Sequence, residues 1–178
     1  MRFKSLQQCI SFLEKEGDLI RLTEPVDPYL EMAEITRQVF EARGPALLFM
    51  NVLNSRFPAV SNLFGTYERT IKIFEPELKY IQALLDITSD TGLILKKPAR
   101  AIQALPSLWH SLPLKSLRPQ VLENICTIAD LPMIQCHSKE GGAFILLPQV
   151  FSMNPDTNSI FRSNLGMYRI QISGNDYL

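Results

Sequence analysis

The sequence predicts an α+β fold in which mixed helices and strands are followed by a region of strands alone. Helix caps and 3.6-residue periodicity alternate with short apolar runs over the first part of the chain. A proline-rich stretch over residues 88–120 separates these from three strand-like segments at 133–136, 143–151 and 165–172. Helices segregated from consecutive strands favour α+β over a doubly wound parallel sheet.

The composition is that of an ordinary globular protein. Of 178 residues, 46% are hydrophobic and 20% are charged, which argues against a fully disordered chain. Lys and Arg together number 18, as do Asp and Glu, so the formal net charge is zero. Binding of nucleic acid or of an anionic membrane surface needs a cationic excess or stripe, so we expect neither partner.

The cysteines and the N-terminal segment indicate a reducing compartment. Cys9, Cys126 and Cys136 are odd in number, far apart and without a CxxC pair, which argues against a disulfide framework or a zinc–thiolate site. Polar residues such as Gln7 and Glu14 interrupt any apolar core of a signal peptide, and no stretch is apolar and long enough to span a bilayer. We therefore expect a cytoplasmic location.

The first helix has clear start and stop signals. Ser5 followed by Gln8 is a capping box that predicts a helix start. Gly17 is typical of the left-handed residue that follows a helix end. A strand is expected over residues 19–22, ended by Glu24-Pro25. The core face of the helix is expected to contain Leu6, Cys9, Ile10 and Leu13.

A second helix is predicted to begin at Asp27-Pro28, with Asp27 as N-cap and Pro28 at the first helical position. Gly44-Pro45 is expected to end it. Its core face is expected to contain Met32, Ile35 and Val39.

Apolar runs at 46–50 and 57–60 predict two buried strands. Thr66 is placed to cap a helix over residues 67–74, and Pro76 to begin a further helix. We divide the chain into an N-terminal α+β domain, residues 1–125, which includes the proline-rich connector at about 88–120, and a strand-rich part, residues 126–178. Asn154-Pro155-Asp156-Thr157 predicts a turn within the second part.

Isolated polar residues are weak site candidates. His110 lies in the connector with no acid or nucleophile at a mechanistic spacing, and we interpret it as a surface or cap residue. His137 lies beside Cys136 and near Glu140, but adjacent strand residues point to opposite faces, so a metal site is not favoured. Gly141-Gly142 indicates a hairpin turn, because no phosphate-loop motif accompanies it. Single arginines are interpreted as solvated charges: Arg43, Arg69 and Arg100.

The run from Ser163 to Arg169 is more informative. Asn164 offers an amide oxygen suited to a divalent cation, and Gly166 allows close approach to the backbone. Arg169 is able to bind a carboxylate bidentately. Strand alternation places Arg169 with Met167 and Gln171 on one face, opposite Tyr168, Ile170 and Ile172. From these residues alone a plain strand is the favoured interpretation.

Four segments, in order, resemble the UbiD family of decarboxylases. They are FLEKEGDLIRLTEPVDPYLEMAEITRQVFEARGPALLF, SRFPAVSNLFGTYER, ADLPMIQCHSKEGGAFILLPQVFSMNPDTN and SNLGMYRIQI. The last is similar to the family's N-x-G-x-[YA]-R core motif. The resemblance covers nearly the whole chain, less clearly residues 75–120, and it implies that residues 126–178 begin a split β-barrel of the flavin-reductase type.

The resemblance implies a carboxy-lyase that acts on aromatic or α,β-unsaturated carboxylic acids with prenylated FMN, a divalent metal such as manganese, and potassium. A UbiX-like prenyltransferase would supply the cofactor, and the complete protein would be a homo-oligomer. Asn164 would be a metal ligand beside the cofactor phosphate. The segment Leu165, Gly166, Met167 and Tyr168 would line the flavin, and Arg169 would hold the substrate carboxylate and pair with the catalytic acid.

The chain departs from this family in length. Family chains are much longer, and the resemblance places the other metal ligands, the catalytic glutamate and the oligomerising domain beyond residue 178. Two hypotheses therefore stay open. The chain is the N-terminal portion of such a decarboxylase, with quinone biosynthesis as one setting, or it is a truncated, non-catalytic homologue or assembly module. The isolated chain is predicted to be inactive, and its unclosed barrel to expose strand edges.

Overall fold

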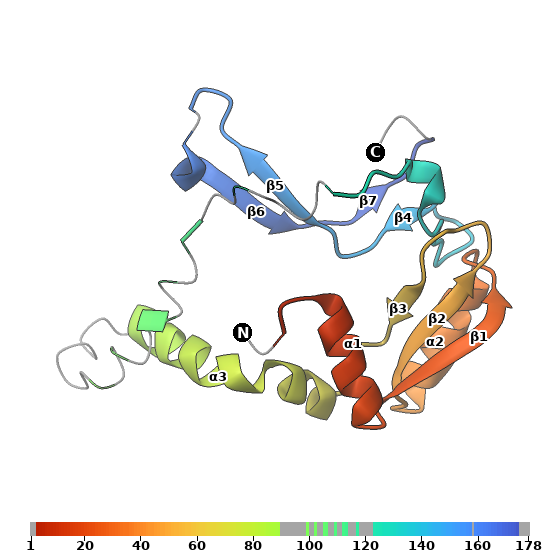
Figure 1. The fold of residues 1–178 in the computed structure, drawn as a ribbon, viewed down its shortest axis with the longest axis horizontal. Helices are drawn as coiled ribbons and strands as arrows, with labels where there is room; N and C mark the ends of the chain where they lie inside the picture. The colour runs from red at the N-terminus through yellow and green to blue at the C-terminus, as the bar shows by residue number, and fades with distance from the viewer. Residues whose placement is uncertain are drawn as a thin grey trace.

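The computed structural model describes residues 3–89, 123–157 and 159–174, with isolated positions between 99 and 117. Most of the expected connector, together with His110 and Arg100, lies outside the described residues. The N-terminal elements are α1 (Leu6–Lys15), β1 (Leu19–Val26), α2 (Glu31–Glu41), β2 (Ala46–Val52), β3 (Ala59–Ser61) and α3 (Tyr67–Ser89). The later elements are η2 (Ile128–Asp130), β4 (Phe144–Ile145), β5 (Gln149–Met153), η3 (Ile160–Arg162), β6 (Ser163–Met167) and β7 (Ile170–Gln171). The α+β class is confirmed (Figure 1).

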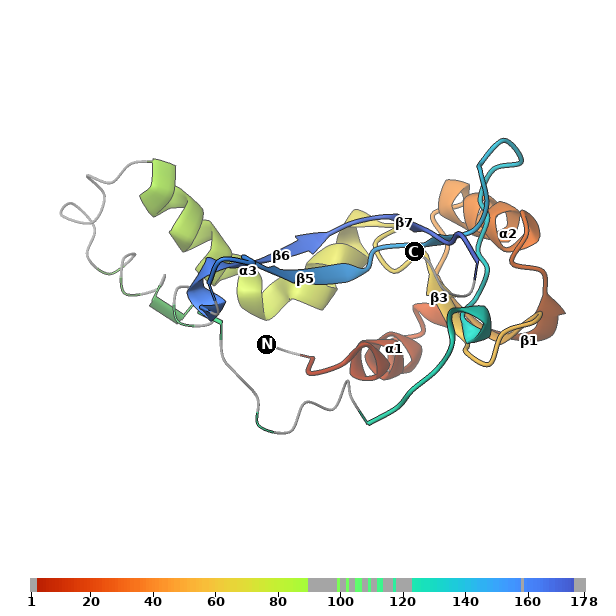
Figure 2. The ribbon, with the colours of Figure 1, turned by 90° about the horizontal axis from the view of Figure 1, so that it is seen from above.

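The N-terminal part is a three-stranded sheet covered on both faces. Strand β2 pairs in parallel with β1 and antiparallel with β3. Alternate residues of β2 enter two cores: Ala46 and Leu48 pack with α1, whereas Leu47 and Phe49 pack with Met32 of α2. Figure 2 shows α1 and α2 on opposite sides of the sheet. The uninterrupted apolar run of β2 therefore follows from burial on both faces.

The predicted helix caps at Ser5 and Thr66 and the predicted helix end at Gly17 are confirmed. The Ser5 hydroxyl accepts a hydrogen bond from Gln8 N, and Gly17 has a φ of 72°. Thr66 Oγ1 accepts a hydrogen bond from Arg69 N at the start of α3. On the predicted face of α1, Cys9, Ile10 and Leu13 are buried, whereas Leu6, the first residue of the helix, is exposed.

Three proline-based predictions were wrong. Strand β1 continues through Glu24-Pro25 by shifting its register against β2 instead of ending. Helix α2 begins at Glu31, because Asp27 Oδ1 accepts a hydrogen bond from Tyr29 N and forms a turn, and Leu30 has a φ of 64°. Helix α3 runs through Pro76, which sacrifices one backbone hydrogen bond but does not end the helix.

Arg69 is buried, which corrects its interpretation as a solvated charge. Its side chain is 1% exposed and lies between three chain segments. Nη1 donates to Asn62 O and Nη2 to Gly44 O, each at 2.6 Å. Nε lies 3.1 Å from Asp18 Oδ2, as an ion pair without hydrogen-bond alignment. This arginine thus joins the start of α3 to the turns that precede β1 and β2 and to the one that follows β3.

The C-terminal part forms a bent antiparallel ribbon instead of two unbroken strands. Strand β4 pairs with β7, and β5 pairs with β6. Between these ladders, residues 146–148 on one strand oppose residues 168–169 on the other. Three residues against two is a β-bulge, which interrupts both predicted strands, 143–151 and 165–172. The predicted turn at Asn154 is confirmed, with Asn154 Oδ1 accepting from Asp156 N.

Backbone hydrogen bonds attach the segment before the ribbon to the N-terminal sheet. Gln135 N donates to Pro28 O, and Leu30 N donates to Gln135 O. Asp130 O accepts from Arg56 N and from the Ser55 hydroxyl. The strand expected at 133–136 is therefore reduced to a single bridge between Tyr29 and Gln135, because its partner is the short turn before α2.

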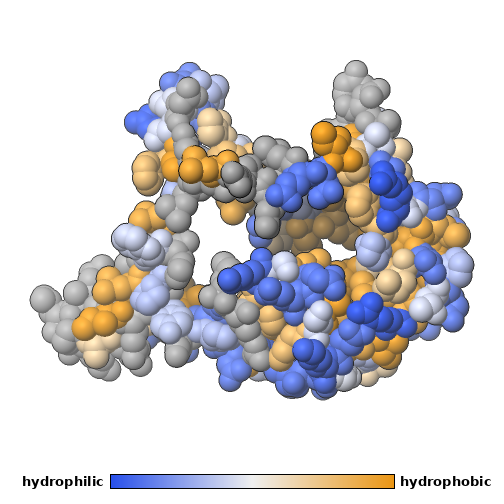
Figure 3. Space-filling model, viewed as in Figure 1, coloured by the Kyte–Doolittle hydropathy of each residue, from blue (hydrophilic) through white to orange (hydrophobic). Residues whose placement is uncertain are grey.

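A split barrel is not confirmed, because the described residues of the C-terminal part form two separate two-stranded ladders. The ribbon leaves several large apolar side chains exposed, visible as orange surface in Figure 3. These include Phe151, Met153, Leu165 and Met167.

We expect Arg69→Met to lower the free energy of unfolding by about 3 kcal/mol, because it leaves two carbonyls and Asp18 without their buried partner. Urea denaturation of the 178-residue chain measures this loss. The matched control is Arg37→Met on α2, whose exposed ion pairs with Glu34 and Glu41 contribute little. Equal unfolding midpoints for the two variants would show that Arg69 has no central structural role.

Candidate functional site

Arg169 lies between β6 and β7, opposite the bulge at residues 146–148, where the ladder is interrupted. Tyr168 N donates to Pro148 O at 3.1 Å, and on the facing strand Leu147 has a φ of 57°. Residues 168 and 169 therefore connect two ladders without belonging to either. A bulge of this kind bends the strand pair locally and interrupts its pairing.

The guanidinium of Arg169 is held from the facing strand and from the loop before it. Its Nη2 forms an ion pair with Glu140 Oε1. Its Cζ lies 3.8 Å from the centroid of the Phe144 ring, a cation–π contact. The arginine side chain stays 47% exposed, whereas that of Glu140 is only 10% exposed.

Glu140 is fixed by its own loop. Its Oε2 accepts hydrogen bonds from Cys136 N at 2.9 Å and from His137 N at 3.2 Å. The hydrogen bond from Arg169, assisted by these two N–H groups, holds the pKa of Glu140 below its ordinary value. Burial and the nearby Glu140 charge raise the pKa of the Cys136 thiol, which therefore stays protonated at neutral pH.

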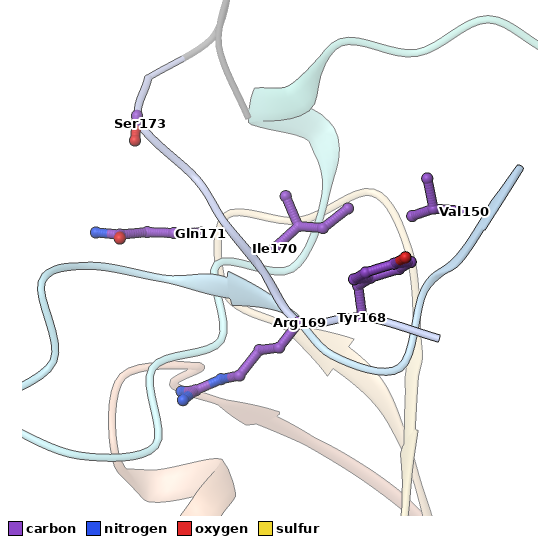
Figure 4. Close-up of a pocket in the computed structure, with 6 residues that line it drawn as sticks. All are labelled: Val150, Tyr168, Arg169, Ile170, Gln171 and Ser173. Carbon is purple, nitrogen blue, oxygen red and sulfur yellow. The ribbon is translucent and has the colours of Figure 1, made fainter. Parts of the chain in front are cut away.

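A cavity of about 540 Å³ borders the bulge (Figure 4). In Figure 4 the Tyr168 ring points toward Val150, and the Arg169 side chain points away from it. The phenol of Tyr168 and the aliphatic side chain of Val150 thus lie on one side of this open depression, and the guanidinium of Arg169 is directed away from them. The cavity is lined by Val150, Tyr168, Arg169, Ile170, Gln171 and Ser173.

The structure places the remaining predicted site residues along β6. Asn164 is exposed and pairs with Ser152 of β5. A side chain at Gly166 would collide with the ring of Tyr168, so this ring occupies the space that the glycine leaves open. Leu165 and Met167 are exposed on the ribbon. Gly166, Tyr168 and Arg169 therefore lie together, and Asn164 is displaced from them along the strand.

The described residues do not complete a metal or flavin site by themselves. Asn164 contributes one amide oxygen, whereas divalent cations take about six oxygen ligands. Within the described ranges, His, Cys, Asp and Glu side chains form no group of three suited to a metal ion. The ring of Tyr168 covers the Gly166 backbone along which a flavin would lie.

His137 and Cys136 belong to a different surface. They line a larger groove, about 890 Å³, between α2 and residues 131–147. The His137 main-chain N–H binds Glu140, and its ring is exposed, so the loop uses this residue through its backbone. Gly141-Gly142 forms part of the same turn, which Phe144 N closes by donating to Ile134 O.

Sequence reasoning missed Glu140 and Phe144 as partners of Arg169. The resemblance implied a pairing of Arg169 with an acid beyond residue 178, whereas its partner in the structure is 29 residues upstream. Strand pairing between Phe144 and Gln171 brings the Glu140 loop to Arg169. The signal available in the sequence was the glycine pair after Glu140, which marks a turn between two strand-like segments.

Comparison with known families identifies the class of protein to which this fold and ribbon belong. Residues 10–88 match the family described as "3-octaprenyl-4-hydroxybenzoate carboxy-lyase N-terminal domain". Residues 113–178 match the family described as "3-octaprenyl-4-hydroxybenzoate carboxy-lyase Rift-related domain". Both are domains of one class of carboxy-lyases. The chain belongs to the UbiD family.

Curated relatives are much longer than this chain. An uncharacterized protein of Chlamydia caviae is 37% identical over 191 residues, a match that covers 100% of this chain and 31% of the relative. A Chlamydia pneumoniae protein, named as one subunit of a 4-hydroxybenzoate decarboxylase, is 36% identical over 179 residues, covering 93% of this chain and 28% of the relative. The chain thus spans about a third of the length of the curated relatives that it matches.

Solved structures support the fold. The UbiD-class enzyme HmfF from Pelotomaculum thermopropionicum, in complex with FMN, has a TM-score of 0.65 at 22% identity, covering 96% of this chain and 35% of that one. Sedimentibacter hydroxybenzoicus vanillic acid decarboxylase in open form has a TM-score of 0.67 at 21% identity, covering 98% and 35%. Across the described part of the chain, no helix combines the length and the apolarity needed to cross a membrane.

The lowered pKa of Glu140 predicts how its loop responds to acid. A carboxyl whose folded pKa is depressed stabilises the fold above its unfolded pKa, and this stabilisation is lost as the pH falls through the folded pKa. We expect the amide resonances of Cys136 and His137 to titrate with a midpoint below that of an ordinary glutamate. The measurement is an NMR pH titration, with Glu140→Gln as the control that abolishes the transition. A midpoint at or above the ordinary value would contradict the ion pair with Arg169.

Proposed function

We propose that this chain is the N-terminal portion of a UbiD-like, non-oxidative decarboxylase that acts on aromatic or α,β-unsaturated carboxylic acids. Family membership supports this reaction class, and the Chlamydia pneumoniae relative carries the name of a 4-hydroxybenzoate decarboxylase. The observation that carries the proposal is the guanidinium of Arg169, which is half exposed and fixed beside an open cavity. Quinone biosynthesis is one setting for such a reaction.

Arg169 is the residue that we assign to the substrate carboxylate. A guanidinium has five N–H donors in a planar fork, which matches the geometry of a carboxylate. Within the described residues, its hydrogen bond to Glu140 uses Nη2 alone, so Nε and Nη1 are left for a second anion. The cavity beside it has the apolar side chains Val150 and Ile170, which suit the carbon skeleton of an unsaturated acid.

The cofactor assignment extends this proposal. Two HmfF structures hold FMN and prFMN, respectively, and we infer that the complete protein uses prenylated FMN supplied by a UbiX-like prenyltransferase. Such a flavin supplies an electron sink for decarboxylation. We further propose that Asn164 becomes a ligand of manganese, with potassium nearby, and that residues 165–168 line the flavin. Both assignments require groups from outside the described residues.

The organisation of the complete protein follows from the same proposal. Residues 1–125 would form one domain, and residues 126–178 the first strands of a split β-barrel that further strands close. The exposed apolar side chains of the ribbon, such as Phe151 and Leu165, support such a cover. We propose a cytoplasmic homo-oligomer, and an evolved HmfF is described as dimeric.

A non-catalytic homologue or assembly module is the second candidate. It would contain the same motifs as the decarboxylase, including the run from Ser163 to Arg169. The reading frame beyond Leu178 separates the two candidates. Continuation to a histidine-containing strand and a glutamate-rich loop supports the decarboxylase, whereas a stop codon supports the module.

We expect the isolated 178-residue chain to lack decarboxylase activity even with prenylated FMN and Mn²⁺ added. Product release requires a proton donor, which the family resemblance places beyond residue 178. The measurement is CO₂ release from 4-hydroxybenzoate and related acids, with the full-length Chlamydia pneumoniae relative as the positive control. Release above a buffer control would overturn this expectation.

We expect Arg169→Lys in the complete enzyme to reduce turnover at least a hundredfold while leaving the melting temperature nearly unchanged. Lysine keeps the charge but lacks the fork that binds a carboxylate bidentately, and the side chain is 47% exposed. Steady-state kinetics and thermal denaturation measure the two effects. Arg162→Lys, on the neighbouring 3-10 helix, is the control for a general loss of guanidinium groups. Near-normal turnover, or a large loss of thermal stability, would mean that Arg169 is structural.

A further inference from the structure

The side chain of Arg169 is held by two residues of the loop and strand that face it. Glu140 contacts Nη2 at the edge of the guanidinium, and the Phe144 ring lies against its face. An edge contact and a face contact together define both the position and the plane of the group. An exposed arginine has many rotamers, so two such contacts restrict it strongly.

Glu140 is fixed before it meets Arg169. Its Oε2 receives two backbone N–H groups, from Cys136 and His137, and its side chain is almost buried. Only Oε1 points to the guanidinium. The carboxylate therefore acts as a rigid acceptor instead of a mobile counter-ion.

Phe144 is placed by the ladder. It pairs with Gln171 of β7, two residues along the chain from Arg169. Its ring accordingly lies on the face to which the arginine points, and its position is set by main-chain hydrogen bonds of β4 and β7.

We propose that Glu140 and Phe144 are positioning residues, which hold the guanidinium of Arg169 so that its remaining N–H donors face an incoming carboxylate. This inference rests on the proposed function, because it takes Arg169 as the carboxylate-binding group. It adds two residues that do not touch the substrate but determine the geometry of the residue that does.

A negative charge beside Arg169 also repels a carboxylate, and this effect opposes the positioning effect. The charge of Glu140 is already compensated by Arg169 and by two N–H donors. The electrostatic repulsion that Glu140 exerts on a bound carboxylate is therefore weak. Loss of the contact, in contrast, releases the whole arginine side chain. We therefore expect positioning to dominate.

Glu140→Gln is a sharp test of this role. The two backbone N–H groups require an acceptor, so they orient the glutamine oxygen toward the loop and its NH₂ toward Arg169. Two donors then face each other, and the contact is lost with almost no change in volume. The probe is 4-fluorobenzoate, titrated into the 178-residue chain and followed by ¹⁹F NMR. A second readout is the rotation of the Arg169 guanidinium, followed by ¹⁵N–¹H NMR.

We expect Glu140→Gln to weaken 4-fluorobenzoate binding about tenfold and to accelerate rotation of the guanidinium. Glu14→Gln is the matched control, because Glu14 forms a similar ion pair with Arg21 far from this site. That control should leave both readouts unchanged. Phe144→Leu keeps the loop hydrogen bonds, so it tests the role if the first variant disturbs the loop, and we expect weakening of several fold.

The outcomes separate this inference from the proposed function. If Arg169→Ala binds the probe as well as the wild type, Arg169 is not the carboxylate-binding group, and its role in the proposed function fails together with this inference. If the wild-type chain does not bind the probe, this inference fails, whereas the proposed function of the complete protein is decided by its decarboxylase activity. If Arg169→Ala abolishes binding while Glu140→Gln retains it or tightens it, Arg169 keeps its role and the positioning inference is wrong. Equal guanidinium rotation in the wild type and Glu140→Gln also overturns the inference.

Discussion

Burial of the Arg69 charge is the constraint on which the N-terminal domain depends. A guanidinium that is 1% exposed must have polar partners, and here they come from three separate turns, through Asp18, Gly44 and Asn62. These turns precede β1, precede β2 and follow β3. One side chain thus holds together the turns at one end of the three strands. The pairing between β1 and β2 starts directly beside it, at the Leu19–Ala46 pair.

The candidate site depends on this sheet through the turn that precedes α2. Gln135 binds the main chain of Pro28 and Leu30, and Asp130 binds that of Arg56. The loop that contains Glu140 follows directly and leads into β4. The position of Arg169 is therefore linked to the N-terminal domain by backbone hydrogen bonds, although its own ribbon has few buried side chains.

Sequence reasoning succeeded where the physical cause is local and failed where it is distant. Ser5, Gly17 and Thr66 act within one helical turn, so their roles were visible in the sequence. Arg69 is buried by partners up to 51 residues away, and no local pattern distinguishes it from a surface arginine. The pairing of Arg169 with Glu140 likewise depends on strand register. The general position of the site was predictable from the core motif, whereas the partners that orient it were not.

The bulge at residues 146–148 reverses which face of the ribbon the side chains of its strand occupy on its two sides. In an unbroken strand, Phe144 would share a face with Val150, because the two are six residues apart. The extra residue instead places Phe144 on the face of Gln171, whereas Val150 lies opposite Gly166. Chain length is thus as decisive here as side-chain identity. Deletion of one residue at 146–148 would leave two residues against two, so the two ladders could join into one and the bulge opposite Arg169 would be lost. A length change in the turn at Asn154 would leave that bulge intact.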